Sequence, residues 1–512
     1  MTKKIIVYIL LSMPLLSMAQ KKDKNAQKAA ATITVEDMKK HLYIIAGPEM
    51  EGRNTPSEGL NRAADYIESQ FKASGLVPGN NGSYRQVYNL YKDSMIGAAI
   101  NINGAALELN KDFQPQSNNY AAEMRFSEAV FAGYGISDEG NRDDYKDLNV
   151  AGKLVIIADG VPADYKSSAT GFASPSSSTG KMNAAISKGA AALIIVYNNF
   201  PRSEMRINSN WSMNSFRAAQ SPFTFTVSEN AVSKIMGEDG KNLFSKLKTG
   251  SLSSKTYSAE VELVYAKQTQ TTTASNVIAV VEGSDLKDEY VFITSHYDHL
   301  GKRGDIIYYG ADDDGSGTTG VIEMAEAFAK AKAAGNGPRR SIVFMTVSGE
   351  EKGLWGSGYY ANHPIFPLEK TTVDLNIDMI GRSDSSRHYG DTLNYVYVVG
   401  DDKISTDLKV ISEAANKLYT KLELDYKFND PNDRNRIYFR SDHYNFAAKG
   451  VPIIFYYDGM LKADYHKPTD TPDKINYPLM AKRTQLVFYT AWEMANRNDM
   501  LKRDIKLEIP KR

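Results

Sequence analysis

The sequence predicts an α/β fold, in which helices cover both faces of a mixed, mostly parallel central sheet, with a smaller β-rich domain inserted. From about residue 275, apolar runs of strand length alternate with helical segments. Alternation of this kind is typical of a largely parallel, two-sided sheet. Between about 101 and 265 the pattern changes to short β-rich runs. That change of pattern predicts the insert.

The elements of the main sheet are predicted from apolar runs and helical spacing. Strands are expected at 277–281, 290–294, 341–347, 375–378 and 451–455, and a helix at 318–332. Earlier in the chain, helical spacing predicts a helix at 60–74, and Thr34 is expected to cap another. In the insert, strands are expected at 129–134, 153–157 and 192–196, a loop at 167–180 and a helix at 182–188.

These patterns divide the chain into five parts. They are a signal peptide (1–19), a flexible tether (20–32), the N-terminal part of the main domain (33–100), the insert (101–268) and the remaining, C-terminal part of the main domain (269–512). The tether is assigned because it is rich in Lys, Ala and Gln.

The N-terminus has the pattern of a secretory signal. Two lysines precede an apolar run at 5–16, and Ser17 and Ala19 stand at positions −3 and −1 of a cleavage site after Ala19. The run is shorter than the ~20 residues that span a bilayer, and Pro14 interrupts it. We therefore expect an exported protein, periplasmic or extracellular, with no membrane contact once the signal is removed.

Composition restricts the chemistry. Lys plus Arg and Asp plus Glu both number 61 among 512 residues, so the formal net charge is zero. This balance provides no electrostatic reason to expect nucleic acid as a partner. The absence of cysteine excludes disulfides, thiolate zinc sites and a Cys nucleophile. Any metal must therefore be bound by imidazole and carboxylate. The oligomeric state is left open.

Metal-type side chains recur at or just past the ends of the predicted strands. They are His296 with Asp298 two residues later, Asp313, Glu350, Glu351, Asp378 and His466. In sheets of this kind, ligands bind outside the carboxyl ends of the strands. Two imidazoles and three carboxylates could hold a pair of divalent ions, leaving one carboxylate to move protons. This set predicts metal-assisted hydrolysis.

Each of these motifs also has an ordinary interpretation when taken alone. The acidic run at 312–314 could be a helix cap or a calcium loop, but it lacks the alternating ligands and the late Glu of an EF-hand. Glu350 and Glu351 could form a solvated turn, and His466 could be a simple loop residue. Most other histidines, His299 among them, are interpreted as ordinary residues, and His443 is a candidate for lining a pocket.

The order and spacing of these motifs resemble the two-zinc aminopeptidase family, which also contains glutamate carboxypeptidases and the transferrin receptor. The matching segments are Ser-His-Tyr-Asp-His-Leu-Gly at 295–301, Gly-Ala-Asp-Asp-Asp-Gly-Ser-Gly at 310–317, Gly-Glu-Glu at 349–351, Asn-Ile-Asp-Met-Ile-Gly at 376–381, and Tyr-His at 465–466 with Asp-Thr at 470–471. The resemblance runs from about residue 275 to the end and includes 50–54 with the helix after it. Residues 129–196 resemble a protease-associated domain, more loosely.

The resemblance implies a role for each residue of the set. Asp313 is expected to bridge two zinc ions, His296 and Asp378 to complete one site, and Glu351 and His466 to complete the other. Glu350 is then the general base, Asp298 an acid that supports a ligand, and Tyr465 a residue that stabilises the tetrahedral intermediate. The resemblance also implies a cis peptide bond between Asp313 and Asp314.

The function implied is that of a secreted aminopeptidase with two zinc ions per chain, acting on peptides with a free N-terminus. Three alternatives remain. A glutamate-releasing carboxypeptidase would need basic groups such as Arg434, Arg436 and Arg440. A glutaminyl cyclase relative would use a single zinc ion. A catalytically inactive binding relative, like the transferrin receptor, would have lost ligands.

Overall fold

The computed structural model describes residues 22–214, 223–430 and 432–508, so the predicted signal peptide lies outside the described residues. The chain forms two compact units, one made of Met1–Tyr88 with Thr273–Arg512 and the other of Asn89–Thr272. The insert was predicted at 101–268. The boundaries differ because strands β2 (Arg85–Ile102) and β11 (Lys255–Val281) continue through them, so that no turn residue marks either point.

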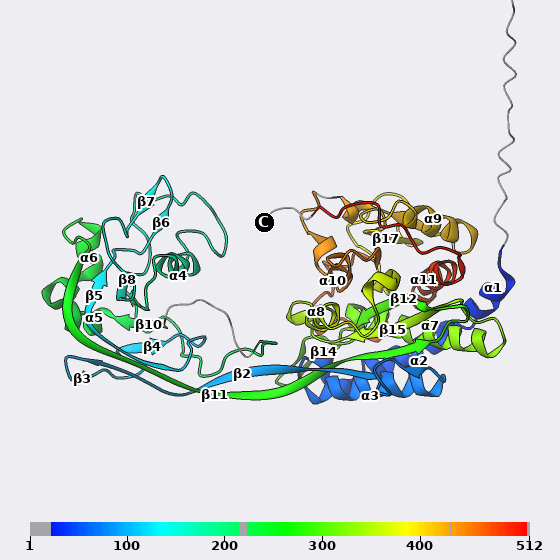
Figure 1. Ribbon diagram of the computed structural model, residues 1–512, viewed down its shortest axis with the longest axis horizontal. Coiled ribbons are helices and arrows are strands. Elements are labelled where there is room, and N and C mark those ends of the chain that lie inside the picture. The colour runs from blue at the N-terminus through cyan, green and yellow to red at the C-terminus, as the bar shows by residue number, and fades with distance from the viewer. Residues whose placement is uncertain (1–21, 215–222, 431, 509–512) are drawn as a thin grey trace, which may run out of the picture. The chain divides into compact units, whose positions relative to one another are not determined.

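The first unit is built on a mixed, mostly parallel sheet, which confirms the predicted fold class (Figure 1). In spatial order, its strands are β18 (Glu423–Asp425), β17 (Tyr395–Val399), β19 (Ile453–Tyr457), β16 (Thr371–Ile377), β12 (Leu286–His296), β15 (Arg340–Val347) and the end of β11. Strands β19, β16, β12 and β15 are mutually parallel neighbours. Strand β17 pairs antiparallel with β19, and β11 pairs antiparallel with β15.

Helices α7 (Gly317–Ala333) and α11 (Tyr477–Asn496) pack on one face of this sheet. Phe344 of β15 contacts Phe328 of α7, and Phe328 lies with its ring centroid 4.4 Å from that of Phe488. All three rings are fully buried. Large aromatic side chains of this kind supply much of the apolar area that holds a helix to a sheet.

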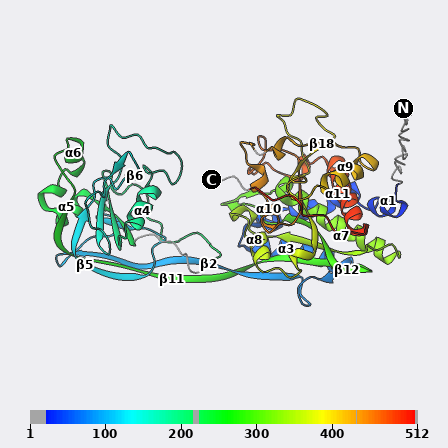
Figure 2. The same cartoon turned by 45° about the horizontal axis from the view of Figure 1, so that its top comes forward.

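Helices α8 (Trp355–Asn362) and α10 (His443–Ala447) pack on the opposite face (Figure 2). Phe292 of β12 packs against both Tyr360 and Phe446, with ring centroids 5.5 and 5.3 Å away. Successive residues of a strand point to opposite faces. Continuous apolar runs such as 290–294 therefore supply both cores, as two-sided parallel strands require.

The N-terminal segment differs from the predicted flexible tether. Residues 24–30 form helix α1 (Lys24–Ala30), whose Ala26, Ala29 and Ala30 are buried and which packs against α7 and α11. Asp23 caps the helix and accepts a hydrogen bond of 3.0 Å from the Trp492 indole. The prediction of a flexible tether was wrong because the buried face of this helix consists only of alanines. Alanines among lysines give the segment the same composition as a flexible linker.

The next two helices confirm the sequence reading. Helix α2 (Val35–Ile45) begins after Thr34, whose hydroxyl accepts from the Asp37 amide at 3.1 Å. Helix α3 is Glu58–Ala73. The other elements of this unit are η1 (Pro48–Arg53), β1 (Val77–Pro78), β13 (Gly301–Arg303), β14 (Ile306–Tyr308), η3 (Ala311–Ser316), η4 (Glu350–Lys352), η5 (Leu368–Lys370), α9 (Leu408–Leu418), η6 (Lys427–Asn429), η7 (Ile437–Phe439) and η8 (Pro472–Lys474).

In the second unit, hydrogen-bonded strands follow in the order β11, β5 (Ala122–Phe131), β8 (Leu154–Ala158), β9 (Ala192–Tyr197), β10 (Phe223–Ser228) and β4 (Phe113–Pro115). Strands β5, β8, β9 and β10 are parallel. Its other elements are β3 (Ala105–Ala106), β6 (Ser137–Asp138), β7 (Arg142–Asp143), α4 (Ser178–Ser187), α5 (Glu229–Met236), η2 (Gly237–Gly240) and α6 (Leu243–Lys248). The three strands predicted for the insert are confirmed. Its resemblance to a protease-associated domain remains a prediction.

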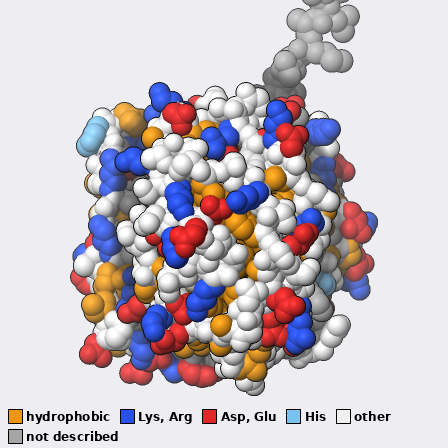
Figure 3. Space-filling model, turned by 90° about the vertical axis from the view of Figure 1, so that its left-hand side faces the viewer, with side chains coloured by type: hydrophobic (Ala, Val, Ile, Leu, Met, Phe, Trp, Pro, Cys, Tyr) orange, Lys and Arg blue, Asp and Glu red, His pale blue; other side chains and the backbone are white. Residues whose placement is uncertain are grey.

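The surface drawn in Figure 3 carries basic and acidic side chains interspersed with one another, as the zero net charge leads one to expect. In the described parts of the chain, no helix combines the length and the apolar character that a bilayer crossing requires.

The α7 face of the first unit can be tested with Phe328→Ala. The side chain is fully buried, so the substitution is expected to lower the free energy of unfolding by about 3–5 kcal/mol. Phe172→Ala is the matched control, because Phe172 is 85% exposed and surface changes cost at most about 0.5 kcal/mol. Urea unfolding followed by tryptophan fluorescence measures both. Equal stability of the two variants would contradict this account of the core.

Candidate metal centre

The predicted metal-type residues meet at the carboxyl edge of the first unit's sheet. His296 is the last residue of β12, Asp378 follows β16, and Glu350 and Glu351 begin the turn η4 after β15. His466 comes from the loop after β19. Because these four strands are parallel neighbours, the residues that follow them reach the same edge. Asp313 reaches it from η3, directly before α7.

One side of the centre is formed around His296. Its Nε2 atom lies 3.3 Å from Asp313 Oδ1, 3.5 Å from Asp378 Oδ1 and 3.9 Å from Glu350 Oε2. His296 is 1% exposed, and the Asp313 side chain is 4% exposed.

The other side is formed around Glu351 and His466. The His466 Nε2 atom lies 3.2 Å from Asp313 Oδ2 and 3.1 Å from Glu351 Oε2. His299 Nδ1 lies 2.8 Å from Glu351 Oε1 and 3.8 Å from Asp313 Oδ2. The two oxygens of Asp313 thus face different histidines, which is the geometry of a bridging carboxylate.

These distances fit a pair of small divalent cations. Tetrahedral zinc with ligands at 2.0–2.1 Å keeps its ligand atoms about 3.3 Å apart, close to the 3.1–3.5 Å spacings among His296, Asp313, Asp378, Glu351 and His466. His296 Nε2 and Asp313 Oδ2 are buried without a hydrogen bond. Buried polar atoms normally have a partner, and a cation on each side of Asp313 would supply it.

The short distances between charged groups in the centre also shift the pKa values of its side chains. Burial would lower the pKa of His466, but the carboxylates of Asp313 and Glu351 outweigh it and raise the pKa to about 10. Burial raises the pKa of Glu350 well above its usual range, and the nearby carboxylates add to this although His296 opposes it. Cation binding must therefore displace protons from this centre.

Asp298, predicted to be an acid that supports a ligand, lies beside His296. The His296 Nδ1 atom lies 3.1 Å from the main-chain oxygen of Asp298 and 3.8 Å from the carboxylate. The carboxylate instead accepts the Glu350 amide at 3.1 Å and the Thr55 hydroxyl at 3.0 Å. Asp298 therefore orients both His296 and the backbone of Glu350. Burial raises its pKa to about 6.

The loop that carries Asp313 is held by buried acids on both sides. The Asp470 carboxylate accepts the amides of Asp312 and Asp313 at 3.1–3.2 Å, and the Asp314 carboxylate accepts the amides of His296, Gly317 and Met379. The Asp313–Asp314 peptide bond is cis, as predicted.

Gly310 precedes this loop with φ +57°. A Cβ atom there would lie 2.5 Å from the His299 ring, so the loop and the imidazole can approach each other only around a glycine.

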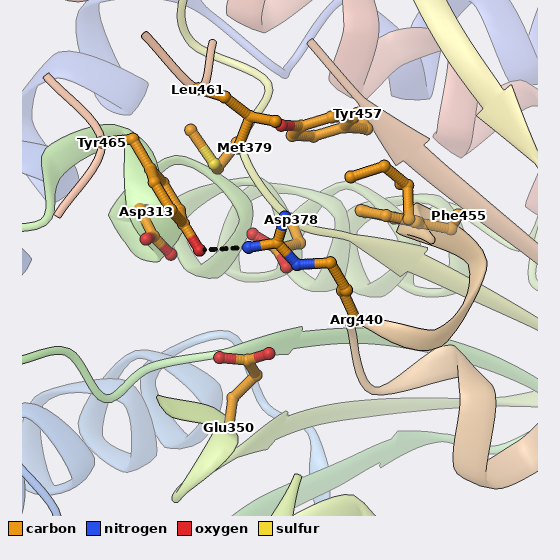
Figure 4. A pocket seen from close by; sticks show the side chains of 10 residues that line it. Asp313, Glu350, Asp378, Met379, Arg440, Phe455, Tyr457, Leu461 and Tyr465 are labelled. Atoms are coloured by element: carbon orange, nitrogen blue, oxygen red, sulfur yellow. Dashed lines mark hydrogen bonds between the residues drawn. The ribbon is translucent and has the colours of Figure 1, made fainter. Parts of the chain in front are cut away.

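A pocket opens beside the centre, and Figure 4 shows the side chains that line it. Glu350, Asp378 and Asp313 form its acidic side, and its apolar side is formed by Met379, Ile437, Phe455 and Leu461. The Tyr465 hydroxyl accepts a hydrogen bond of 2.9 Å from the Arg440 guanidinium. This contact leaves the phenolic proton free to be donated into the pocket. His443, the candidate for lining a pocket, is instead fully buried against Phe455 and donates to the Tyr438 carbonyl.

Three residues that hold the centre together were not predicted as site residues: His299, Asp470 and Arg53. His299 lies three residues after His296 in the same motif, and Asp470 lies four residues after His466; these spacings were the available signals. Arg53 is fully buried. Its guanidinium donates to the carbonyl oxygens of Tyr297, Ile45, Tyr309 and Gly310 at 2.7–2.9 Å.

Arg53 therefore joins the loop after β12 to the segment before η3. Burial lowers its pKa to about 10, while Asp298 and Asp470 oppose the shift, so the group remains cationic at neutral pH. The matching segment at 50–54 was the only sequence signal for it, and nothing local indicated which carbonyls it would reach.

Comparisons with known proteins agree with this geometry. Residues 276–491 match the model of Peptidase family M28. A probable leucine aminopeptidase of Arthroderma otae is 28% identical over 228 residues, which cover 44% of this chain and 58% of that protein. A probable zinc metalloprotease of Leptosphaeria maculans is 38% identical over 120 residues, covering 22% of this chain and 26% of that protein.

Two further similarities extend over most of the chain. Leucine aminopeptidase 2 of Trichophyton rubrum is 23% identical over 478 residues, covering 88% of this chain and 81% of that protein. The structure of an aminopeptidase from Aneurinibacillus sp. strain AM-1 matches with a TM-score of 0.52 and 20% identity, covering 94% of this chain and 99% of that one; this similarity shows the fold. The chain spans between about a quarter and three fifths of the first curated relatives it matches.

Arg53→Met tests whether Arg53 positions the metal-type residues. Removing the donors frees both loops, and losses of this kind typically weaken metal binding by about 10–100-fold. Zinc titration of metal-free protein measures the affinity, and circular dichroism checks the fold. Arg62→Met is the control, because Arg62 is a partly exposed arginine paired with Glu51. Unchanged zinc affinity in a folded Arg53→Met protein would show that Arg53 does not position the centre.

Proposed function

Because residues 276–491 belong to peptidase family M28, we propose that the protein is a zinc-dependent aminopeptidase that hydrolyses N-terminal residues from peptides. The observation that carries the proposal is the Asp313 carboxylate, whose two oxygens face His296 on one side and His466 on the other. Two zinc ions are proposed, one bound by His296, Asp313 and Asp378 and one by His466, Asp313 and Glu351.

Bound zinc in such a site acts as a Lewis acid and lowers the pKa of a bound water from ~15.7 towards ~7. Glu350 is proposed to accept a proton from the attacking water and to deliver it to the leaving amine. Its carboxylate lines the pocket 3.9 Å from His296 Nε2, and its backbone is fixed by Asp298. Burial raises the pKa of Glu350, while nearby cations would lower it towards the value a base needs at neutral pH.

Tyr465 is proposed to donate a hydrogen bond to the oxyanion that forms on the substrate carbonyl. Arg440 supports this role, because it donates to the Tyr465 oxygen and so leaves the phenolic proton for the substrate. Glu350 and Asp378 are proposed to hold the substrate's free ammonium group. The apolar residues Met379, Phe455 and Leu461 favour an apolar N-terminal side chain.

The carboxypeptidase alternative has less support. It requires basic groups that face the catalytic pocket, and of Arg434, Arg436 and Arg440 only Arg440 lines it. Arg434 and Arg436 line a different cavity, beside Phe428 and Tyr438. The inactive alternative predicts lost ligands, whereas all five proposed ligands are present.

We also propose that the protein is exported, on the basis of the signal pattern at 1–19.

Glu350→Gln tests the assignment of the base. The variant is expected to retain zinc and to lose about 10²–10⁴-fold in kcat, the range for general acid–base catalysis. Peptide hydrolysis and zinc content are measured together. The control is Glu369→Gln, an exposed glutamate, which should remain fully active. Near-normal turnover of Glu350→Gln would remove Glu350 as the base.

Substrates with free and blocked N-termini test the exopeptidase assignment. Leucyl and glutamyl amides are expected to be cleaved only when the amine is free, and the leucyl amide should be cleaved faster because the pocket is apolar. Chelation should abolish activity and zinc should restore it. Cleavage of blocked substrates alone would contradict the aminopeptidase proposal, and activity that survives complete chelation would contradict the metal mechanism.

A further inference from the structure

A second group of metal-type side chains lies between helices α2 and α7. Among the residues that the structure describes, three sets bring ligand atoms of three His, Asp or Glu side chains within 4.8 Å of one another. Two belong to the centre described above. The third consists of His41 on α2 and of Glu323 and Glu326 on α7, which share no residue with that centre.

Glu323 is the unusual member of this set. Its side chain is 2% exposed, and its Oε1 atom makes no hydrogen bond although it is buried. That oxygen points towards His41, whose Nε2 atom lies 3.4 Å away. This separation is close to the ~3.3 Å between ligand atoms of tetrahedral zinc. A buried carboxylate oxygen without a partner is costly, and a cation would remove that cost.

The other nitrogen of His41 has the partner that a ligating imidazole needs. Nδ1 lies 2.8 Å from the hydroxyl of Tyr66, a residue of α3. Histidines that bind metal almost always donate their second ring N–H to an oxygen, which fixes the ring orientation. With Nδ1–H donated to Tyr66, the Nε2 lone pair faces Glu323 and Glu326.

Glu326 provides an open side for entry. It is partly exposed and forms an ion pair with Lys330, one turn later on α7. This exposed pair is worth little, so a divalent cation could displace the lysine ammonium. Asp37 and Glu326 add negative charge near Glu323, and burial raises the Glu323 pKa to about 8. A bound cation would keep the carboxylate ionised at neutral pH.

We propose that His41, Glu323 and Glu326 bind a third divalent cation of the zinc class, which ties α2 to α7. One imidazole and two carboxylates with a water in the fourth position form a donor set that zinc accepts. The proposed role is structural, because the three ligands join two helices and none of them belongs to the centre around Asp313. The proposal does not depend on the proposed peptidase function.

The test is the zinc content of the full chain, measured by mass spectrometry after equilibration with buffered zinc and removal of the excess. Wild type is expected to hold one equivalent more than either Glu323→Gln or His41→Gln. Hydrolytic activity of these variants should match wild type at ambient temperature. Glu369→Gln is the control and should hold the wild-type amount. If the centre around Asp313 bound no zinc, the zinc content of wild type and of every variant would fall by the same amount. The difference in zinc content between wild type and the variants would therefore still report on the third site alone.

Glu326→Gln keeps the test valid if changes at the buried positions prevent folding, because this side chain is partly exposed. It should also lose one equivalent. In addition, zinc should raise the Tm of wild type more than that of Glu326→Gln. Equal zinc content in wild type and Glu326→Gln, with equal responses of Tm to zinc, would overturn the proposal and leave the His41–Glu323 ion-pair contact as the explanation.

Discussion

The Asp313 carboxylate lies between two imidazoles in a buried site that also contains Glu350, Glu351 and Asp378. Several carboxylates cannot stay ionised together in such surroundings unless positive charge compensates them. The imidazoles can supply part of that charge: although burial lowers the pKa of His466, the carboxylates of Asp313 and Glu351 raise it to about 10. The demand for cations at this point explains why so many acidic residues can be packed at one edge of a sheet.

The rest of the first unit serves to hold this edge in place. Parallel strands bring residues that are distant in sequence to a single edge, and buried polar groups then fix the loops. Arg53 joins the loop after β12 to the segment before η3, Asp470 holds the amides of the Asp313 loop, and Asp298 holds the amide of Glu350. A site fixed by hydrogen bonds to the backbone can hold cations and substrate with little rearrangement, which favours catalysis.

The sequence predicted the strands and the residues at their ends because both depend on local patterns. Apolar runs identify β12, β15 and β16, and the polar residues that follow them identify His296, Glu350 and Asp378. Contacts between segments could not be read in this way. His299 was passed over because one histidine in a motif looks like another, and only the fold shows that it faces Glu351.

Other differences have similar physical causes. The α1 helix was missed because its buried face consists of alanines in a lysine-rich segment, and its stability comes from packing on α7 and α11. The unit boundaries were displaced because β2 and β11 continue through them. The prediction for Asp298 named no atom, because the spacing of two residues shows which face they share but not which atom of Asp298 approaches the His296 ring.

Anomalous X-ray diffraction at the zinc edge, on crystals of the zinc-loaded full chain, tests the central claim most directly. At the carboxyl edge of the sheet, the account predicts two peaks about 3.5–4 Å apart, one beside His296 and Asp378, the other beside His466 and Glu351, with one oxygen of Asp313 directed at each. A single peak at this edge, or two peaks there that Asp313 does not bridge, would contradict it.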